Sequence, residues 1–243
     1  MADEGVRLFD QPGGDAQGAL ESAASQLRGT PSPAGGFSAR WREVFRRRQE
    51  RDFLAWAREN TRLISPAGYL PQAERGGEEH RLWLDSDRIR YWKATYPGCA
   101  GFTVIASEET GGSADLAPAL PLEYLQRLLL QNQLFGDDIH LEGVAVEGNK
   151  MAIITSQPVL LGQPAKEEDI TALMTKLWFR SLVGLHLGRP GSLSFYRDLD
   201  GIAAFDAHPG NFVKDTQSVV LPIDLILLRV SDLLLQALTR FLN

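Results

Sequence analysis

The sequence predicts an α+β fold in two lobes, with a β-rich first lobe and a reduced helical second lobe. Two observations carry this prediction. Stretches with the composition of β-hairpins flank a helical stretch between positions 80 and 155, and a longer helical pattern starts at position 166. The composition allows such a fold, because 44% of the 243 residues are hydrophobic, which is enough for a substantial core.

The β-rich lobe is predicted from segments rich in bulky and β-branched residues. Residues 80–84 and 88–95 flank an Asp-Ser-Asp turn and predict one hairpin. Residues 139–146 and 150–155 flank Glu-Gly-Asn and predict a second. A further strand is expected at 102–106, followed by a loop that leads to the next helix.

Four helices are predicted, and the best defined is residues 121–135, where proline suits the first turn and leucines recur on one side. The other three are expected over 38–62, 166–187 and 230–242. The N-terminal stretch is rich in Gly, Ala, Ser, Pro and Gln, which is typical of a loosely ordered arm. The predicted organisation is an arm (1–37), a helix (38–62), a first lobe (63–161) and a second lobe (162–243).

A set of polar residues lies in the predicted second lobe. Asn211 follows Asp206 by five positions, and Asp224 comes thirteen positions later, after the apolar run 219–223. Phosphoryl transfer from ATP needs such a set, because one carboxylate orients the attacking hydroxyl while an amide oxygen and a second carboxylate hold Mg²⁺. The alternative is a simple turn, since Asp, Pro, Gly and Asn in Asp-Ala-His-Pro-Gly-Asn all favour turns.

This loop resembles the catalytic loop of protein kinases and, in Asp-x-His-Pro-Gly-Asn, still more that of aminoglycoside phosphotransferases. With residues 91–98 and 134–139, it is similar to the kinase-like domain found in polyvalent proteins of phages and conjugative elements. The resemblance implies an ATP- and Mg²⁺-dependent phosphotransferase. It also implies that Asp206 is the catalytic residue and that Asn211 and Asp224 bind the metal.

Three departures from the family pattern concern the second lobe. Leu225-Ile226 follows Asp224 where kinases have Phe-Gly, and Ala204 stands where a histidine is usual. Residues 225–243 are too few for the usual helical platform. We therefore expect a reduced second lobe.

The first lobe has a candidate lysine for the phosphates. Lys93 alternates onto the same strand face as Ile89 and Tyr91, which suits a side chain that reaches into a cleft. The resemblance implies that it holds the α- and β-phosphates of ATP. The alternative is a lysine whose stem packs on the sheet while its ammonium group reaches water. The downstream loop favours the phosphate role.

The resemblance implies two further parts of an ATP site. Glu123, the one acidic residue of the predicted helix 121–135, would pair with Lys93, although it could instead complement the helix dipole. Gly76 and Gly77 precede the first hairpin, where a glycine-rich loop would cover the phosphates, although a plain hairpin turn fits equally well.

Charge and composition exclude other classes. The net charge of −6 argues against a general nucleic-acid binder. A single cysteine excludes an internal disulfide and suits a reducing, cytoplasmic compartment. No apolar run approaches the roughly 20 residues of a membrane span. We expect a minimal protein kinase with ATP and Mg²⁺ as cofactors and a hydroxyl acceptor. The alternatives are a small-molecule kinase and a catalytically weak nucleotide-binding or interaction module.

Overall fold

The computed structural model has an α+β fold, which confirms the predicted class. It describes residues 6–7, 16–29, 39–87, 89–107, 109 and 111–242. The helices are α1 (Ala16–Arg28), α2 (Ala39–Glu59), α3 (Pro66–Tyr69), α4 (Pro121–Phe135), α5 (Glu167–Lys176), α6 (Asp232–Thr239) and the 3₁₀ turn η1 (Pro209–Asn211). The strands are β1 (Val6–Arg7), β2 (Leu63–Ile64), β3 (Glu74–Gly76), β4 (His80–Leu84), β5 (Arg90–Thr95), β6 (Phe102–Ala106), β7 (Ala114–Pro118), β8 (His140–Glu147), β9 (Lys150–Pro158), β10 (Gln163–Pro164), β11 (Arg180–Ser181), β12 (Leu193–Arg197), β13 (Ile202–Ala207), β14 (Phe212–Lys214), β15 (Val220–Pro222) and β16 (Ile226–Arg229).

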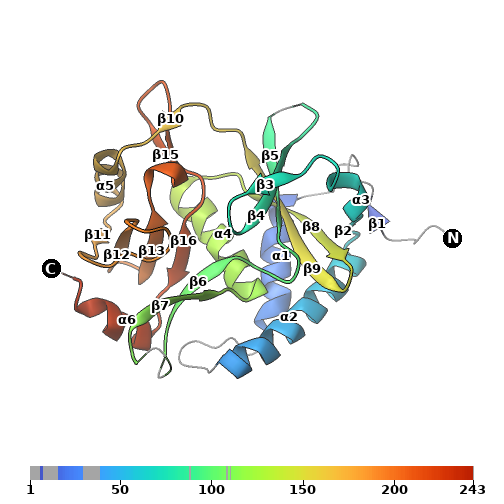
Figure 1. Ribbon diagram of the computed structural model, residues 1–243, viewed down its shortest axis with the longest axis horizontal. Coiled ribbons are helices and arrows are strands. Elements are labelled where there is room, and N and C mark those ends of the chain that lie inside the picture. The colour runs from blue at the N-terminus through green and yellow to red at the C-terminus, as the bar shows by residue number, and fades with distance from the viewer. Residues whose placement is uncertain are drawn as a thin grey trace.

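The molecule has two halves that lie side by side, with α4 between them (Figure 1). Over the described part of the chain, the first half holds a seven-stranded sheet in the order β1-β2-β8-β9-β5-β4-β3. Both predicted hairpins lie in this sheet, because β4 pairs with β5 and β8 pairs with β9 in antiparallel fashion. That the two halves are kinase-like lobes is still a prediction.

Helices α1, α2 and α4 cover one face of this sheet, and Leu125 and Ile153 are buried between them. Helix α1 corrects the prediction of a loosely ordered arm over residues 1–37, because Leu20 and Leu27 are almost fully buried in this core. The apolar positions 20, 23, 24 and 27 have the spacing of an amphipathic helix, and alanine favours helix. Much of the remaining predicted arm lies outside the described residues.

The second half is built largely from strands, which corrects the prediction of a helical second lobe. Its sheets have the orders β11-β12-β13-β16 and β10-β14-β15. The predicted helix over 166–187 ends at Lys176, because Trp178 has a φ of 66° and a right-handed helix cannot continue through that conformation. Residues 114–118, predicted as loop, form β7 and pair with β6.

Helix α4 contacts both halves. Leu122 and Leu125 belong to the core of the first half, whereas Leu130 packs with Phe179 and Phe195 of the second. Residues between these positions on α4 therefore lie at the boundary where the two halves meet.

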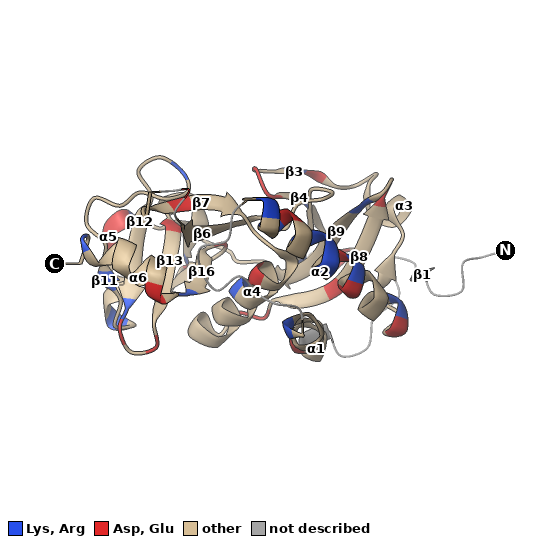
Figure 2. Cartoon of the chain, turned by 90° about the horizontal axis from the view of Figure 1, so that it is seen from below, with Lys and Arg blue, Asp and Glu red and all other residues tan. Residues whose placement is uncertain are grey.

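Helix α2 carries alternating basic and acidic side chains (Figure 2). Arg46 pairs with Glu43 and Glu50 of the same helix, so acids balance this basic run locally. Among the helices that the structure describes, none is both long and apolar enough to cross a membrane.

Candidate functional site

Lys93 lies on β5 at the boundary between the halves. In the sheet it stands between Leu82 of β4 and Thr155 of β9, and the residue is only 8% exposed. Its Nζ lies 3.8 Å from Oδ2 of Asp224, which comes from the second half. The structure thus brings together the lysine and the carboxylate that the sequence singled out, 131 positions apart in the chain.

Asp224 lies in the short segment that joins β15 to β16, and three basic groups surround it. Besides Lys93, its carboxylate accepts a hydrogen bond from Arg127, and Nδ1 of His80 lies 3.7 Å away. Burial alone would raise the pKa of Asp224, but Lys93, followed by Arg127 and His80, lowers it by more. The carboxylate is therefore ionised at neutral pH.

Arg127 of α4 joins three segments of the chain. Its Nη1 donates to both carboxylate oxygens of Glu79 (3.0 and 3.1 Å), its Nη2 donates to Asp224, and its Nε donates to the Leu225 carbonyl (2.7 Å). Sequence reasoning missed this residue, because it sought an acid on the helix. The available signal was a lone arginine among the leucines of the helix side that faces the core.

Glu79 follows the turn that links β3 to β4. Its carboxylate accepts from the Phe102 backbone N–H at 3.0 Å as well as from Arg127. Burial raises the pKa of Glu79, an effect that Arg127 opposes and the charge of Asp224 reinforces. The sequence did not single out this carboxylate, which places a second negative charge beside Asp224.

The two glycines of the predicted phosphate loop have structural reasons to be glycine. A Cβ on Gly76 would lie 2.2 Å from Cγ of Leu82, and Gly77 has a φ of 83° at the turn. Both glycines therefore suit the hairpin turn between β3 and β4, and their role in covering the phosphates stays a prediction.

The predicted pairing of Glu123 with Lys93 is wrong. Oε2 of Glu123 lies 2.7 Å from Nη2 of Arg42 on α2, and the same oxygen accepts from the Leu120 backbone N–H at 2.7 Å. Glu123 sits in the first turn of α4, where it accepts from the backbone N–H of Leu120, the residue before the helix, and pairs with Arg42 of α2. The face of α4 that is turned to Lys93 and Asp224 instead carries Arg127, one turn further along.

His80 and Asp137 complete the surroundings of Lys93. Nε2 of His80 lies 2.9 Å from the Tyr124 hydroxyl, and burial, together with Lys93 and Arg127, lowers the pKa of His80 to about 3. His80 is therefore neutral. Burial raises the pKa of Asp137, whose carboxylate accepts from Gln131 and feels the charge of Lys93.

The predicted catalytic loop begins with Asp206, the penultimate residue of β13. Asp206 has a φ of 59°, a left-handed conformation that costs a residue with a side chain about 1–2 kcal/mol. Its Oδ1 accepts from the Arg189 backbone N–H (2.7 Å) and the Ser192 hydroxyl (2.9 Å). The side-chain amide of Asn211 donates to the Asp206 carbonyl (2.9 Å) and to Oδ2 (3.2 Å). Neutral donors therefore orient this carboxylate.

This loop lies beside Asp224. The Ile223 backbone N–H donates to the Asn211 carbonyl at 2.7 Å, which ties the loop to the residue before Asp224. Burial lowers the pKa of His208, although the negative charges of Asp206 and Asp224 oppose this effect. Nε2 of His208 lies 3.8 Å from Oδ1 of Asp206.

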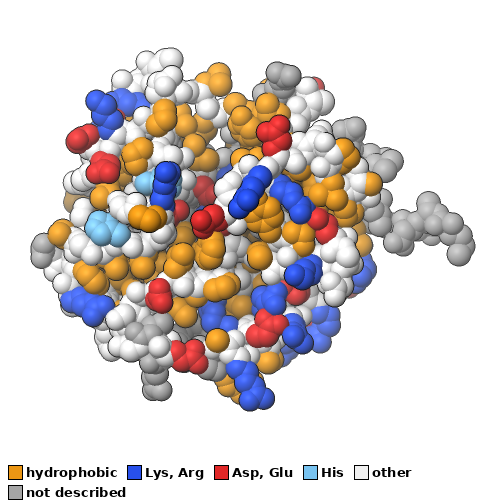
Figure 3. All heavy atoms as spheres, in the orientation of Figure 1, with side chains coloured by type: hydrophobic (Ala, Val, Ile, Leu, Met, Phe, Trp, Pro, Cys, Tyr) orange, Lys and Arg blue, Asp and Glu red, His pale blue; other side chains and the backbone are white. Residues whose placement is uncertain are grey.

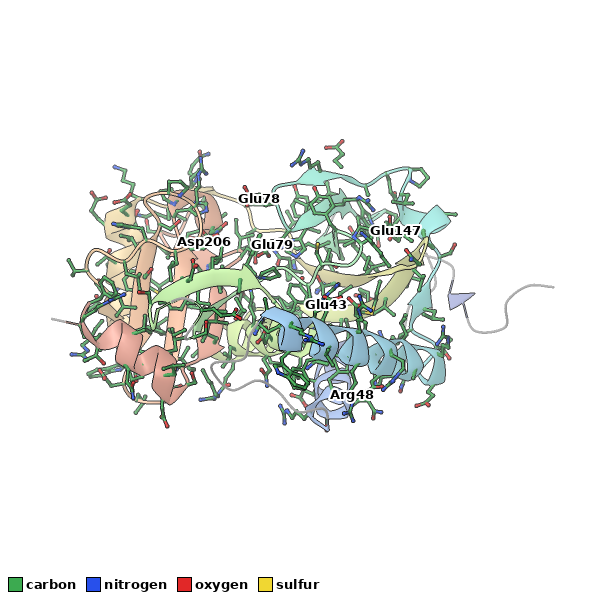
Figure 4. The ribbon with its side chains drawn as sticks, turned by 60° about the horizontal axis from the view of Figure 1, so that its bottom comes forward. Glu43, Arg48, Glu78, Glu79, Glu147 and Asp206 are labelled. Carbon is green, nitrogen blue, oxygen red and sulfur yellow. The ribbon has the colours of Figure 1, made fainter. Side chains whose placement is uncertain are left out.

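Acidic side chains gather near the middle of the face shown in Figure 3, between the two halves. In Figure 4 Glu79 lies at the boundary and Asp206 lies on the side of the second half.

The donor atoms of Asn211 and Asp224 fit Mg²⁺, which prefers oxygen ligands. The Asn211 amide nitrogen is used within the loop, so its side-chain oxygen can act as a ligand. A second group, Glu79, His80 and Asp224, has ligand atoms within 4.8 Å of one another, but Arg127 bonds to both of its carboxylates.

No family model, no curated protein and no solved structure matches this chain. The resemblance to the kinase-like domain of polyvalent proteins therefore stays a prediction.

Proposed function

We propose that the protein is an ATP- and Mg²⁺-dependent phosphotransferase that acts on a hydroxyl acceptor, and that it is a minimal protein kinase. One observation carries the proposal. A buried lysine of the first half lies 3.8 Å from Asp224, which adjoins the loop that holds Asp206 and Asn211. Phosphoryl transfer requires a cation on the phosphates, oxygen ligands for the metal and a carboxylate for the acceptor.

Each residue has a distinct role in this proposal. Lys93 binds phosphate oxygens of ATP, and Asn211 and Asp224 supply oxygen ligands for Mg²⁺, which neutralises the charge on the phosphates when bound. Asp206 orients the acceptor hydroxyl and takes its proton. Oδ2 is the oxygen suited to this task, because Oδ1 already accepts two hydrogen bonds shorter than 3 Å and Oδ2 accepts a longer one from Asn211.

The strained backbone of Asp206 supports this role. A left-handed aspartate costs folding energy, and such conformations cluster at functional sites where the surrounding structure holds them. Three neutral donors hold the direction of the carboxylate without cancelling its charge. Catalysis would rest on positioning and charge stabilisation.

A second candidate, a nucleotide-binding module without transfer activity, is favoured by the connection between β3 and β4. It holds Gly76 and Gly77 but lacks the Gly-x-Gly-x-x-Gly pattern with which kinases position the phosphates for transfer. The two candidates differ in turnover but not in binding. A small-molecule kinase, the other alternative, differs in its acceptor.

The deciding experiment incubates the protein with γ-labelled ATP, Mg²⁺ and either a protein extract or a pool of small metabolites. Asp206→Asn should lower the rate of label transfer by about 10²–10⁴-fold, the usual contribution of a positioned acid–base group, with nearly unchanged ATP affinity. The matched control is Asp198→Asn, which alters a surface carboxylate of the same half that pairs with Arg180.

Label in protein supports the protein kinase, and label in a metabolite supports the small-molecule kinase. ATP binding without transfer supports the binding module. Absence of Mg²⁺-dependent ATP binding contradicts the proposal altogether.

A further inference from the structure

We propose that Arg127 is the positioning residue of Asp224, and that it keeps Asp224 available for metal and Lys93 available for phosphate. The effect of Arg127 on metal binding rests on the proposed function, whereas its positioning of the Asp224 side chain does not. Sequence motifs gave Arg127 no role, and it emerges from the contacts around Asp224.

The geometry of Arg127 is fully determined by its partners. Its three kinds of nitrogen contact Glu79, Asp224 and the Leu225 carbonyl, and the residue is 3% exposed. A guanidinium group is planar, so donors fixed on three sides leave it one orientation. Because it binds both the side chain of Asp224 and the next carbonyl, it fixes the carboxylate relative to its own backbone.

Glu79 holds Arg127 through Nη1, next to the Nη2 that donates to Asp224. The Glu79 carboxylate also accepts from the Phe102 N–H, and it packs so closely on Gly101 that a Cβ there would lie 2.9 Å from Oε2. Glu79 is thus held by rigid backbone on its far side. Hydrogen bonds therefore connect the Phe102 backbone N–H to Glu79, Glu79 to Arg127, and Arg127 to Asp224.

This arrangement decides which cation the carboxylate of Asp224 binds directly. Arg127 binds Oδ1 of Asp224, while Oδ2 stays 3.8 Å from Nζ of Lys93, which is longer than a hydrogen bond. Without Arg127, the carboxylate would turn toward Lys93, the nearest remaining cation. A direct pair would withdraw Asp224 from a metal and Lys93 from the phosphates.

Arg42 provides a matched control. Arg42 is also buried, with 9% of the residue exposed. Its Nη1 and Nη2 donate to the carboxylate of Glu123 on α4, and its Nη2 also donates to the Pro118 carbonyl. Arg42→Met removes the buried ion pair with Glu123 of α4, whereas Arg127→Met removes the two ion pairs with Glu79 and Asp224. Only Arg127→Met touches Asp224.

The experiment measures two quantities on the full chain. The first is the Mg²⁺ concentration that gives half-maximal thermal stabilisation by ATP. Arg127→Met should raise it by roughly 10- to 100-fold, as expected for a group that orients a metal ligand, while Arg42→Met leaves it within about twofold. Arg127→Lys and Glu79→Gln, which disturb folding less, should give intermediate increases. Equal values for Arg127→Met and Arg42→Met overturn the proposal.

The second quantity is independent of nucleotide. Urea unfolding of Arg127→Met, Asp224→Asn and the double variant gives the coupling between the two residues, and the same cycle is measured with Lys93→Met. The coupling through Arg127 should exceed the coupling through Lys93 by roughly tenfold in the unfolding equilibrium constant. A coupling no larger than that of Lys93 overturns the proposal. If the wild-type protein binds no Mg²⁺–ATP, the proposed function fails, and this cycle alone decides the role of Arg127.

Discussion

The loop around Asp206 and the charged residues around Asp224 surround two similar carboxylates with different kinds of partner. The two side chains are almost equally exposed, 24% for Asp206 and 25% for Asp224. The donors to Asp206 are a backbone N–H, a hydroxyl and an amide, all from its own half. Asp224 is surrounded instead by Lys93 from the first half and Arg127 from α4 at the boundary.

This difference shows how a fold can prepare two carboxylates for different tasks. Neutral donors fix the direction of a carboxylate and leave its negative charge uncompensated, which suits a group that is to accept a proton. Cations cancel the charge and keep the group ionised where burial would otherwise protonate it. Under the proposed function, Asp206 is the first kind and Asp224 is the second.

The largest expected effect tests the charge balance around Asp224. His80 faces Asp224, Lys93, Arg127 and Tyr124, and its folded-state pKa of about 3 lies below its ordinary value of 6.5. Between these values the unfolded chain binds a proton that the folded protein does not, so stability should fall as pH falls.

The loss due to His80 should approach 1.4 kcal/mol per pH unit below pH 6.5, or about 3 kcal/mol between pH 7 and pH 4. Urea unfolding between pH 7 and pH 4 would measure it. His80→Asn should remove this part of the slope, whereas His186→Asn, which changes an exposed histidine, should leave it unchanged. Equal slopes for the two variants would contradict the assignment.

The next effect separates the two carboxylates by their dependence on metal. Asp224→Asn should abolish the stabilisation that ATP gives in the presence of Mg²⁺, which is about 2.7 kcal/mol at 100 times the dissociation constant. Thermal unfolding with ATP and Mg²⁺, and with EDTA as control, measures this loss. Retention of the full Mg²⁺-dependent shift would mean that Asp224 is no metal ligand.

A smaller effect tests how tightly Asp206 is held. A Cβ on Gly188 would lie 2.3 Å from Oδ1 of Asp206, whereas a Cβ on Gly191 would meet nothing within 4 Å. Both glycines have positive φ, 101° and 84°, so each alanine variant should lose about 1–2 kcal/mol of stability.

Only Gly188→Ala should also lower turnover, by roughly tenfold or more, because a displaced catalytic group costs rate. Melting temperature and label transfer, measured on both variants, make the comparison. A similar loss of turnover in Gly191→Ala would assign the effect to backbone strain.

The smallest effect sharpens the boundary of the charged residues around Asp224. Glu123→Gln should lower stability by about 1 kcal/mol, because the Arg42 ion pair is weakened, and should leave ATP affinity unchanged. Isothermal titration with Mg²⁺–ATP checks this, with Glu79→Gln as the comparison. A weakened ATP affinity in Glu123→Gln would mean that Glu123 takes part in ATP binding.

The elements predicted best are those whose signals are local. The hairpins at 80–95 and 139–155 and the helix at 121–135 are specified by side-chain periodicity and turn residues, and all three are present. The loop of Asp206 and Asp224 are also close in the chain. The hairpin of β14 and β15 between them folds back on itself and places Ile223 next to Asn211.

Other features could not be obtained from spacing in the chain. Arg127 and Glu79 are 48 positions apart, and each has an unremarkable sequence context. Glu123 and Arg127 are one helical turn apart, and the packing of α4 against its neighbours decides that Arg127 meets Asp224 while Glu123 meets Arg42. Likewise, the apolar pattern beyond Lys176 suits a buried strand as well as a helix.

The sequence by itself determined the α+β class, the principal hairpins and helix α4, because propensity and periodicity act over a few neighbouring positions. The tertiary structure alone decided which charges meet. Ion pairs form between groups that packing brings within about 4 Å, and their strength depends on the burial that the whole fold creates. The partners of Asp224 are therefore a property of the assembled molecule.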